Sequence, residues 1–259
     1  MIRRSRLDTE LVRRRLAGSR DEAQDLIRNG RVLVNGAPAD KAARHVGTGD
    51  NLHVEGPPAR FVSRGGEKLQ AALEHFRISA VDARALDVGA STGGFTDCLL
   101  QAGARHVVAF DVGHGQLHPQ VRHDPRVVVV EGRNIRQYDP QQWGADFDLV
   151  VADVSFISLT VIAEILVSLC RSEGSLVVLV KPQFEAGRAE VSRGRGVISD
   201  PEIHEAACRK VADAFTARGA EIQGLIPSPL LGGSGNREFL LYATVRERLP
   251  AMNRPWGPS

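Results

Sequence analysis

The chain has 259 residues, of which 42% are hydrophobic and 25% charged, proportions typical of a globular protein with one or two domains. Its longest aliphatic runs, Val127 to Val130 and Leu176 to Val180, are far shorter than the roughly 20 apolar residues of a membrane-spanning helix. The basic N-terminus lacks an apolar signal segment, and three scattered cysteines indicate neither a disulfide framework nor a zinc cluster. We therefore expect a cytoplasmic protein that spans no membrane and binds no metal.

Positive charge is concentrated in the first 60 residues, which carry 12 Lys and Arg against 8 Asp and Glu. Nine arginines fall within residues 1–31, and arginine suits planar, bidentate contacts with phosphate. This pattern indicates either a polyanionic partner or a solvated helix face, and charge alone does not choose between them.

A small α+β module is predicted at the N-terminus. Apolar spacing indicates a helix over Leu7–Leu16 and a second helix that ends at Gly30, where a C-terminal cap belongs. Arg31–Gly36 is typical of a strand that runs into an Asn-Gly turn, with Asn51–Val54 as its later partner. We expect two helices and a small sheet here.

These segments resemble the alpha-L RNA-binding motif of ribosomal proteins and pseudouridine synthases, through Arg6-Leu7-Asp8, Ser19 to Ala23 and Gly30 to Gly36. The resemblance implies an RNA-binding domain over residues 1–58, followed by a linker over residues 59–66. It also implies phosphate contacts from four arginines: Arg4, Arg6, Arg20 and Arg31.

Beyond the linker, short apolar runs alternate with helical stretches, which is typical of a mostly parallel sheet flanked by helices. We expect an α/β, Rossmann-like domain over residues 67–247 and a flexible tail over residues 248–259. Its seven strands are predicted at residues 85–88, 106–111, 126–130, 149–153, 176–181, 221–226 and 238–245. Its helices are predicted at residues 68–76, 94–102, 160–170 and 201–218.

A glycine-rich turn follows the first of these strands and opens a helix, as expected where backbone approaches a nucleoside ligand. Its spacing does not fit the G-x-G-x-x-G fingerprint of dinucleotide-binding enzymes. The order D-x-G-x-x-x-G-G-F instead resembles the first motif of S-adenosylmethionine (SAM) methyltransferases. The resemblance implies cofactor contacts from Asp87, Gly89, Ala90, Ser91, Thr92, Gly93, Gly94 and Phe95.

Asp111 ends the next strand, at the spacing of an acid that accepts hydrogen bonds from ribose hydroxyls. Val112 beside it, Asn134 after the third strand and Asp153 after the fourth complete the expected SAM site. For Asn134, a contact with the adenine edge and a purely structural role both remain open. A structural turn without any ligand is the alternative for the whole glycine-rich segment.

The chemistry of such folds lies at the end of the fourth strand, here Val150 to Phe156. The Asp/Asn-Pro-Pro motif of amino-methylating enzymes is absent there, and Cys98, Cys170 and Cys208 fall in predicted helices, which disfavours a cysteine nucleophile at a strand end. The reaction that remains possible is transfer of a methyl group to an oxygen or an unreactive nitrogen.

Four charged residues resemble the Lys-Asp-Lys-Glu tetrad of FtsJ-like ribose 2′-O-methyltransferases: Lys68, Asp153, Lys181 and Glu238. The resemblance implies that Lys181 is the general base for the ribose hydroxyl. Burial and the neighbouring Lys68 would favour its neutral amine, whereas the two carboxylates would favour the ammonium.

Most of the chain resembles the TlyA family, through Ser63 to Leu69, Ala90 to Thr96, Asp153 to Ser158 and Lys181 to Glu185. Members are described both as hemolysins and as 2′-O-methyltransferases of cytidines in ribosomal RNA, so ribosomal RNA is the expected partner. A membrane-active protein and a non-catalytic ribosome-assembly factor are the alternatives. We also expect Arg188, Arg193 and Arg195 to contact RNA phosphates, with a solvated mobile loop as the other interpretation.

Overall fold

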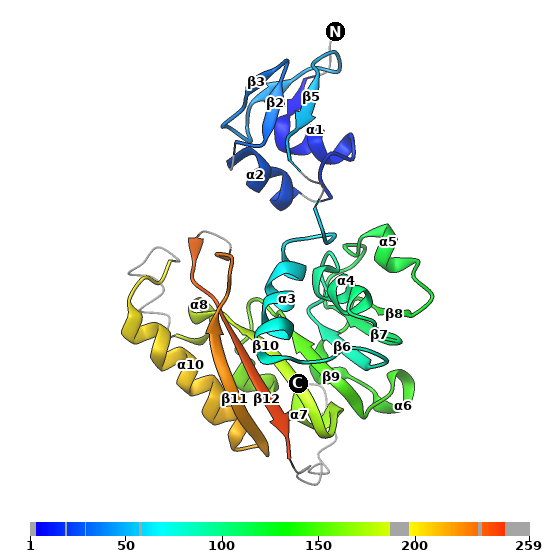
Figure 1. Cartoon of the computed structure of the whole chain (residues 1–259), viewed down its shortest axis with the longest axis vertical. Coiled ribbons are helices and arrows are strands. Elements are labelled where there is room, and N and C mark those ends of the chain that lie inside the picture. Colours follow the sequence, from blue (N-terminus) through cyan, green and yellow to red (C-terminus); the bar gives the residue numbers. More distant parts are fainter. Residues whose placement is uncertain are drawn as a thin grey trace. The chain divides into compact units, whose positions relative to one another are not determined.

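The computed structural model describes residues 4–18, 20–28, 30–56, 59–186, 197–232 and 235–246. The chain folds as two compact units, Met1–Arg64 and Gly65–Ser259, which are described separately below (Figure 1).

The smaller unit packs two amphipathic helices against short strands. The helices are α1 (Leu7–Arg13) and α2 (Arg20–Arg28); the strands are β1 (Ser5–Arg6), β2 (Val32–Val34), β3 (Ala37–Pro38), β4 (His45–Val46) and β5 (Leu52–Val54). One sheet has the order β3-β2-β5, and β1 pairs with β4. Leu7, Leu11 and Ile27 from the helices meet Val32 and Val34 in one core because their spacing puts them on the inner faces.

The predicted pairing of β2 with β5 is confirmed, with Leu33 opposite His53. Gly30 has a φ of 69° and lies at the helix end, where the N–H of Arg31 donates to the carbonyl of Leu26. The first helix ends at Arg13 rather than Leu16, since the backbone leaves the helix at Arg15, whose φ is 59°. The two-residue strands β1, β3 and β4 were not predicted because so short a segment carries no periodicity.

The larger unit is built on a seven-stranded sheet of order β11-β12-β10-β9-β6-β7-β8. Its strands are β6 (Arg84–Val88), β7 (His106–Phe110), β8 (Val127–Val130), β9 (Phe147–Ala152), β10 (Cys170–Val180), β11 (Ala220–Pro227) and β12 (Phe239–Val245). The five strands β10, β9, β6, β7 and β8 are parallel to one another. β12 runs antiparallel to both of its neighbours, β10 and β11. All seven predicted strands are confirmed.

Helices cover both faces of the sheet (Figure 1). α3 (Gly65–Phe76) and α4 (Gly94–Gln101) pack together on one face, and α7 (Leu159–Leu169) and α10 (Pro201–Thr216) pack on the other. This two-sided burial explains the continuous apolar runs of β9 and β10. Asp200 caps α10, since its carboxylate accepts from the N–H of Glu202.

Cys170 was placed wrongly in a helix. It is the first residue of β10, because α7 ends at Leu169 and the chain continues directly into the strand. It pairs with Phe147 at the amino end of the parallel strands, so it lies at the opposite end of β10 from Lys181. A cysteine nucleophile at the carboxyl edge is still disfavoured, because Cys170 lies at the opposite edge of the sheet.

Four short helices were also not predicted: α5 (Pro119–Arg122), α6 (Pro140–Trp143), α8 (Pro182–Glu185) and the 3-10 helix η1 (Ile135–Gln137).

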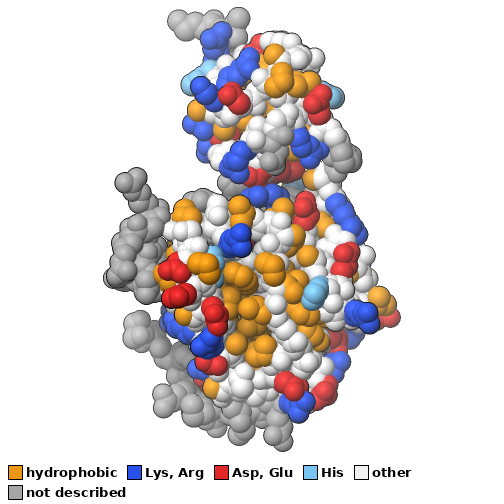
Figure 2. All heavy atoms as spheres, turned by 60° about the vertical axis from the view of Figure 1, so that its left-hand side comes forward, with side chains coloured by type: hydrophobic (Ala, Val, Ile, Leu, Met, Phe, Trp, Pro, Cys, Tyr) orange, Lys and Arg blue, Asp and Glu red, His pale blue; other side chains and the backbone are white. Residues whose placement is uncertain are grey.

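On the face that carries α10, an apolar groove runs between this helix and β11 and β12 (Figure 2). Ala212, Ile222, Leu225, Phe239 and Leu241 line it. No helix among the described residues is long and apolar enough to cross a membrane.

Candidate active site

The predicted cofactor and tetrad residues of the larger unit lie mainly along the edge of the sheet where the parallel strands end. Asp87 lies near the end of β6, and Asp111, Asp153 and Lys181 directly follow β7, β9 and β10. Glu238 joins them because β12 is antiparallel and begins at this edge, where Phe239 pairs with Val180. Ligand sites of open α/β sheets form at this edge.

The glycine-rich turn lies close to the chain that carries Asp153. A Cβ atom on Gly89 would lie 2.3 Å from the carbonyl oxygen of Asp153, and Gly89 has a φ of 85°. Gly93, with a φ of 95°, precedes α4 and would carry a Cβ only 2.9 Å from Leu117. Glycine is therefore required at both positions, and the turn brings the proposed cofactor segment against the proposed catalytic one.

The remaining residues of this turn differ in exposure. Ala90, Gly93, Gly94 and Phe95 are buried, whereas Ser91 is exposed and Thr92 half-buried. Phe95 is 3% exposed, so its side chain packs into the interior.

Asp87 is fully buried, and one of its carboxylate oxygens accepts a 2.6 Å hydrogen bond from the hydroxyl of Thr96. Its other oxygen, Oδ1, has no hydrogen-bond partner among the described residues. Burial raises the pKa of Asp87 to about 7, with smaller contributions from the charges of Asp153 and Asp111. An unsatisfied buried acceptor of this kind matches a ligand that brings a donor or a positive charge.

Asp111 is held by the backbone around it. Its Oδ2 accepts from the N–H of Ser91 at 2.7 Å, and its Oδ1 accepts from the N–H of Gly113 at 2.5 Å. Val112 next to it is 73% exposed. The Asn134 side-chain oxygen accepts from the N–H of Arg136 and caps η1, so a contact with adenine would have to use its amide nitrogen.

The first half of the predicted tetrad forms an ion pair at the ends of β9 and β10. The Nζ atom of Lys181 lies 2.6 Å from Oδ1 of Asp153 and donates to the hydroxyl of Ser155 at 3.0 Å. The Lys181 side chain is 11% exposed and that of Asp153 22%. The amine is therefore fixed in position but still reachable from solvent.

The second half is more deeply buried. The Nζ atom of Lys68, on α3, lies 2.5 Å from Oε2 of Glu238, and both side chains are at least nine-tenths buried. A Cβ atom on Gly232 would lie 1.9 Å from Oε1 of Glu238, so only glycine leaves room for this carboxylate. The sequence signal at Gly232 was not recognised.

Three further residues beside Lys181 were also missed as functional candidates. Phe156 is 92% exposed and has a φ of 65°, a left-handed conformation that is rare for an aromatic residue. Its ring lies 5.3 Å from that of Phe184, which in turn lies 6.0 Å from the Lys181 ammonium. Buried Glu185 accepts from the hydroxyl of Ser158 and the N–H of Leu159, and so connects α8 with the start of α7.

The four predicted RNA contacts of the smaller unit differ in what holds them. Arg6 and Arg20 both pair with the fully buried carboxylate of Asp8, at 2.9 and 3.2 Å. Hydrogen bonds from Arg6 hold the pKa of Asp8 well below its usual range. Arg31 donates to the carbonyl of Glu55, and Arg4 is exposed. The predicted contacts Arg188, Arg193 and Arg195 lie outside the described residues.

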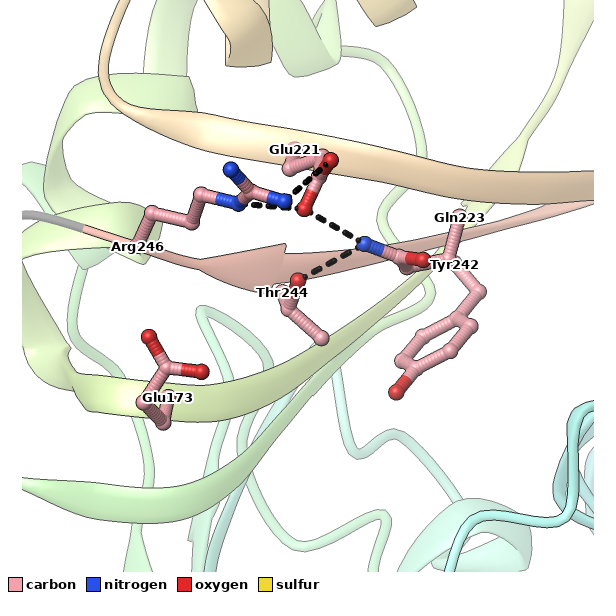
Figure 3. Close-up of a pocket in the computed structure, with 6 residues that line it drawn as sticks. All are labelled: Glu173, Glu221, Gln223, Tyr242, Thr244 and Arg246. Carbon is pink, nitrogen blue, oxygen red and sulfur yellow. Dashed lines mark hydrogen bonds and ion pairs between the residues drawn. The ribbon is translucent and has the colours of Figure 1, made fainter.

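A separate polar pocket lies at the other end of the sheet (Figure 3). Arg246 pairs there with Glu221 through two contacts, and the Gln223 amide bridges Glu221 and Thr244. These polar groups bind one another, and Glu173 and Arg246 lie toward the amino end of the parallel strands. Within the described ranges, no cluster of His, Cys, Asp or Glu could hold a metal ion.

The sequence matches two family models. Residues 61–244 match the FtsJ-like methyltransferases, and residues 5–52 match the S4 domain. The sheet order, with its single antiparallel strand, and the acids at the strand ends agree with that match. The chain therefore belongs to the FtsJ-like methyltransferases, as a member of the TlyA family with an N-terminal S4 domain.

Individual relatives cover nearly the whole chain. The 16S/23S rRNA (cytidine-2′-O)-methyltransferase TlyA of Mycobacterium tuberculosis is 48% identical over 93% of this chain and 90% of its own length. Hemolysin A of Brachyspira hyodysenteriae is 40% identical over 93% of this chain and all of its own. A solved structure of a hemolysin-named protein from Streptococcus thermophilus superposes with a TM-score of 0.77 and 38% identity, over 96% of this chain and 90% of its own.

The family uses SAM as its methyl donor, and the edge described above fits this cofactor. SAM carries a sulfonium, an ammonium and a vicinal diol, which are cationic or hydrogen-donating groups. Asp87, with a free buried oxygen, and Asp111 supply acceptors at the ends of neighbouring strands. The chain is a SAM-dependent methyltransferase.

Proposed function

We propose that this protein transfers the methyl group of SAM to a ribose 2′-hydroxyl of ribosomal RNA, on a cytidine, in the cytoplasm. The observation that carries the proposal is the pair of lysine–carboxylate ion pairs at the carboxyl edge, Lys181 with Asp153 and Lys68 with Glu238. The names of the relatives, including the Mycobacterium tuberculosis enzyme, support the choice of cytidine in ribosomal RNA.

A ribose hydroxyl is a weak nucleophile, so its methylation requires a base and precise placement. When bound, SAM supplies an electrophilic methyl group. The ion-paired ammonium of Lys181 must first release a proton to solvent; its neutral Nζ can then accept the hydroxyl proton as the 2′-oxygen takes up the methyl group that the bound cofactor would supply. Asp153 and Ser155 orient this amine, and Glu238 keeps Lys68 in place beside the site.

The exposed ring of Phe156 offers a surface for the base of the target nucleotide. It follows Asp153 by three residues and is supported by Phe184, so a base stacked there would lie near Lys181. Stacking of a base on an aromatic side chain contributes roughly 1–3 kcal/mol. Phe156→Ala should weaken binding of the substrate RNA, while Phe156→Tyr should retain it.

The S4 domain would supply phosphate contacts through Arg4, Arg6, Arg20 and Arg31. Arg188, Arg193 and Arg195 remain predicted contacts for the same RNA. Neutralising these three should weaken RNA binding without affecting SAM; equal RNA affinity would favour a loop that is merely solvated.

The decisive experiment incubates purified ribosomal subunits with the enzyme and SAM carrying a labelled methyl group. We expect label in one or a few cytidines, where the 2′-O-methyl group blocks alkaline cleavage of the adjacent phosphodiester bond. Label on a base, or a product that alkali still cleaves at the labelled nucleotide, would exclude ribose methylation. Tight RNA binding without any transfer would favour a non-catalytic assembly factor.

Membrane activity is the competing function, because two of the relatives described above are named hemolysins. A direct test adds the purified protein to dye-loaded lipid vesicles under the conditions of the methylation assay. Leakage without methyl transfer to RNA would reverse our proposal.

A further inference from the structure

Gln116, which neither the sequence motifs nor the family resemblance singled out, lies where the glycine-rich turn meets Asp111. Its side-chain oxygen accepts a 3.2 Å hydrogen bond from the hydroxyl of Ser91. The same segment is docked on the turn a second time, since the N–H of His118 donates to the carbonyl of Thr92 at 3.1 Å. Gln116 is thus held over the proposed cofactor segment although it is exposed.

The amide nitrogen of Gln116 and the carboxylate of Asp111 both lie beside Gly113. A Cβ atom built on Gly113 would lie 2.6 Å from Nε2 of Gln116 and 2.9 Å from Oδ1 of Asp111, so both atoms pack against the same side of this glycine. Because the Gln116 oxygen is engaged by Ser91, the orientation of the amide is set and its nitrogen is left to donate. A side chain at position 113 would displace one of these two groups, so glycine lets them lie side by side.

The Asp111 carboxylate already accepts one backbone hydrogen bond on each oxygen. These bonds fix its orientation and leave each oxygen able to accept once more. A hydroxyl group both donates and accepts, so an acceptor and a donor placed side by side match it completely. Carboxylate alone would satisfy only the hydroxyl hydrogens of a vicinal diol.

We propose that Gln116 is a cofactor-binding residue that donates a hydrogen bond to a ribose hydroxyl of SAM, while Asp111 accepts from the diol. This inference rests on the proposed function only in that both place SAM at this edge. It adds a second contact to the ribose and explains why Ser91 and Gly113 flank that contact.

The test is the binding of S-adenosylhomocysteine, and of its 2′-deoxy and 3′-deoxy analogues, measured by calorimetry with the full-length protein. For Gln116→Ala we expect a loss of about 3- to 10-fold in affinity for the parent compound, as for one neutral hydrogen bond. Against one of the deoxy analogues the variant and the wild type should bind nearly alike, because the group that Gln116 contacts is missing.

Gln120→Ala is the matched control, since it removes the same side chain from the exposed α5 segment a turn further on. It should bind all three compounds like the wild type. If Gln116→Ala lost the same factor with every compound, Gln116 would only support the glycine-rich turn and the inference would be wrong. Unchanged affinity for the parent compound would also overturn it. Failure of the wild type to bind S-adenosylhomocysteine would instead contradict the assigned cofactor site.

Discussion

The two units use the same ion-pairing residues in opposite ways. In the smaller unit, which contains the S4 domain, three buried carboxylates each hold two guanidinium groups: Asp8 holds Arg6 and Arg20, Glu10 holds Arg13 and Arg14, and Asp25 holds Arg28 and Arg64. In the methyltransferase domain, Asp153 and Glu238 each hold one lysine. The first arrangement keeps a net positive charge and leaves most of its arginines substantially exposed. The second is neutral, and its lysines are more deeply buried than those arginines.

This difference follows from what each unit is proposed to do. A phosphate backbone is bound by excess positive charge at the surface, and arginine provides it without any change of protonation. Proton transfer needs an amine that can become neutral, which lysine can and arginine cannot. Substitutions that exchange these properties test the comparison most directly, and the expected effects below run from the largest to the smallest.

Lys181→Ala should lower the single-turnover rate of methylation by about 10²–10⁴-fold, the usual effect of losing a general base. Affinity for SAM and for RNA should change little. Lys181→Arg should fail as well, because guanidinium keeps the charge but does not accept a proton near neutral pH. If Lys181→Arg retained the wild-type rate, Lys181 would act by charge alone and the base would have to be sought in Asp153, Glu238 or solvent.

Gly232→Ala should reduce the methylation rate by about 10²-fold, because the new Cβ atom would displace the Glu238 carboxylate from its bond with Lys68. Binding of S-adenosylhomocysteine, measured by calorimetry, should stay close to that of the wild type. Gly49→Ala is the matched control, since nothing lies within 4 Å of its Cβ position. A normal rate for Gly232→Ala would show that the Lys68–Glu238 pair is not needed for transfer.

Asp111→Ala should weaken SAM binding by roughly 1.5–3 kcal/mol, the contribution of a hydrogen bond to a charged acceptor. RNA affinity should be unaffected, since Asp111 belongs to the proposed cofactor side of the site. Calorimetry with SAM and filter binding with RNA separate the two effects, and unaltered SAM affinity would remove Asp111 from the site.

The strands could be predicted from the sequence because they depend on a pattern that extends along the chain, and Asp153, Lys181 and Glu238 could be placed at their ends for the same reason. Buried parallel strands require continuous apolar runs, and residues that follow such strands meet at one edge. Contacts such as Phe156 on Phe184, Gly232 against Glu238 and Gln116 above Ser91 depend on loop conformation. A loop carries no periodicity, so only coordinates reveal these contacts.

The two units also differ in the pKa values of their buried carboxylates. The pKa of Asp87 is raised to about 7, whereas the pKa values of Asp8 and Glu10 in the S4 domain are lowered. The cationic groups of SAM should favour its ionised form, so affinity should rise by up to about tenfold per pH unit below 7 and level off above it. Asp87→Asn should bind SAM with little dependence on pH. An equally flat profile for the wild type would contradict a role for Asp87 in binding.

The same raised pKa affects stability without ligand. The folded protein holds this proton at pH values where the unfolded chain has lost it, between about 4 and 7. The stabilising contribution is therefore complete at low pH and is lost as the pH rises toward 7. Compared with Asp87→Asn, the free energy of unfolding of the wild type should fall across that range, as denaturant titrations at several pH values can measure.

Arg20→Gln gives the smallest expected effect and isolates the surface charge of the S4 domain. Arg20 is 58% exposed, and its removal leaves Asp8 bonded to Arg6, Gln24 and the N–H of Thr9, so the fold should persist. The loss of one phosphate contact should reduce the slope of log affinity against log salt by about 0.7–0.9, and affinity roughly fourfold at 0.15 M salt.

Arg171→Gln supplies the control for that measurement, because Arg171 is also exposed and paired with an aspartate, Asp148, but lies at the amino end of β10. Its loss lowers the net charge by the same amount at a place where no RNA contact is proposed. If both variants reduced the salt slope equally, RNA binding would respond to total charge rather than to the arginines grouped around Asp8. A reduction confined to Arg20→Gln would establish that the buried carboxylate of the S4 domain holds its arginines for the RNA.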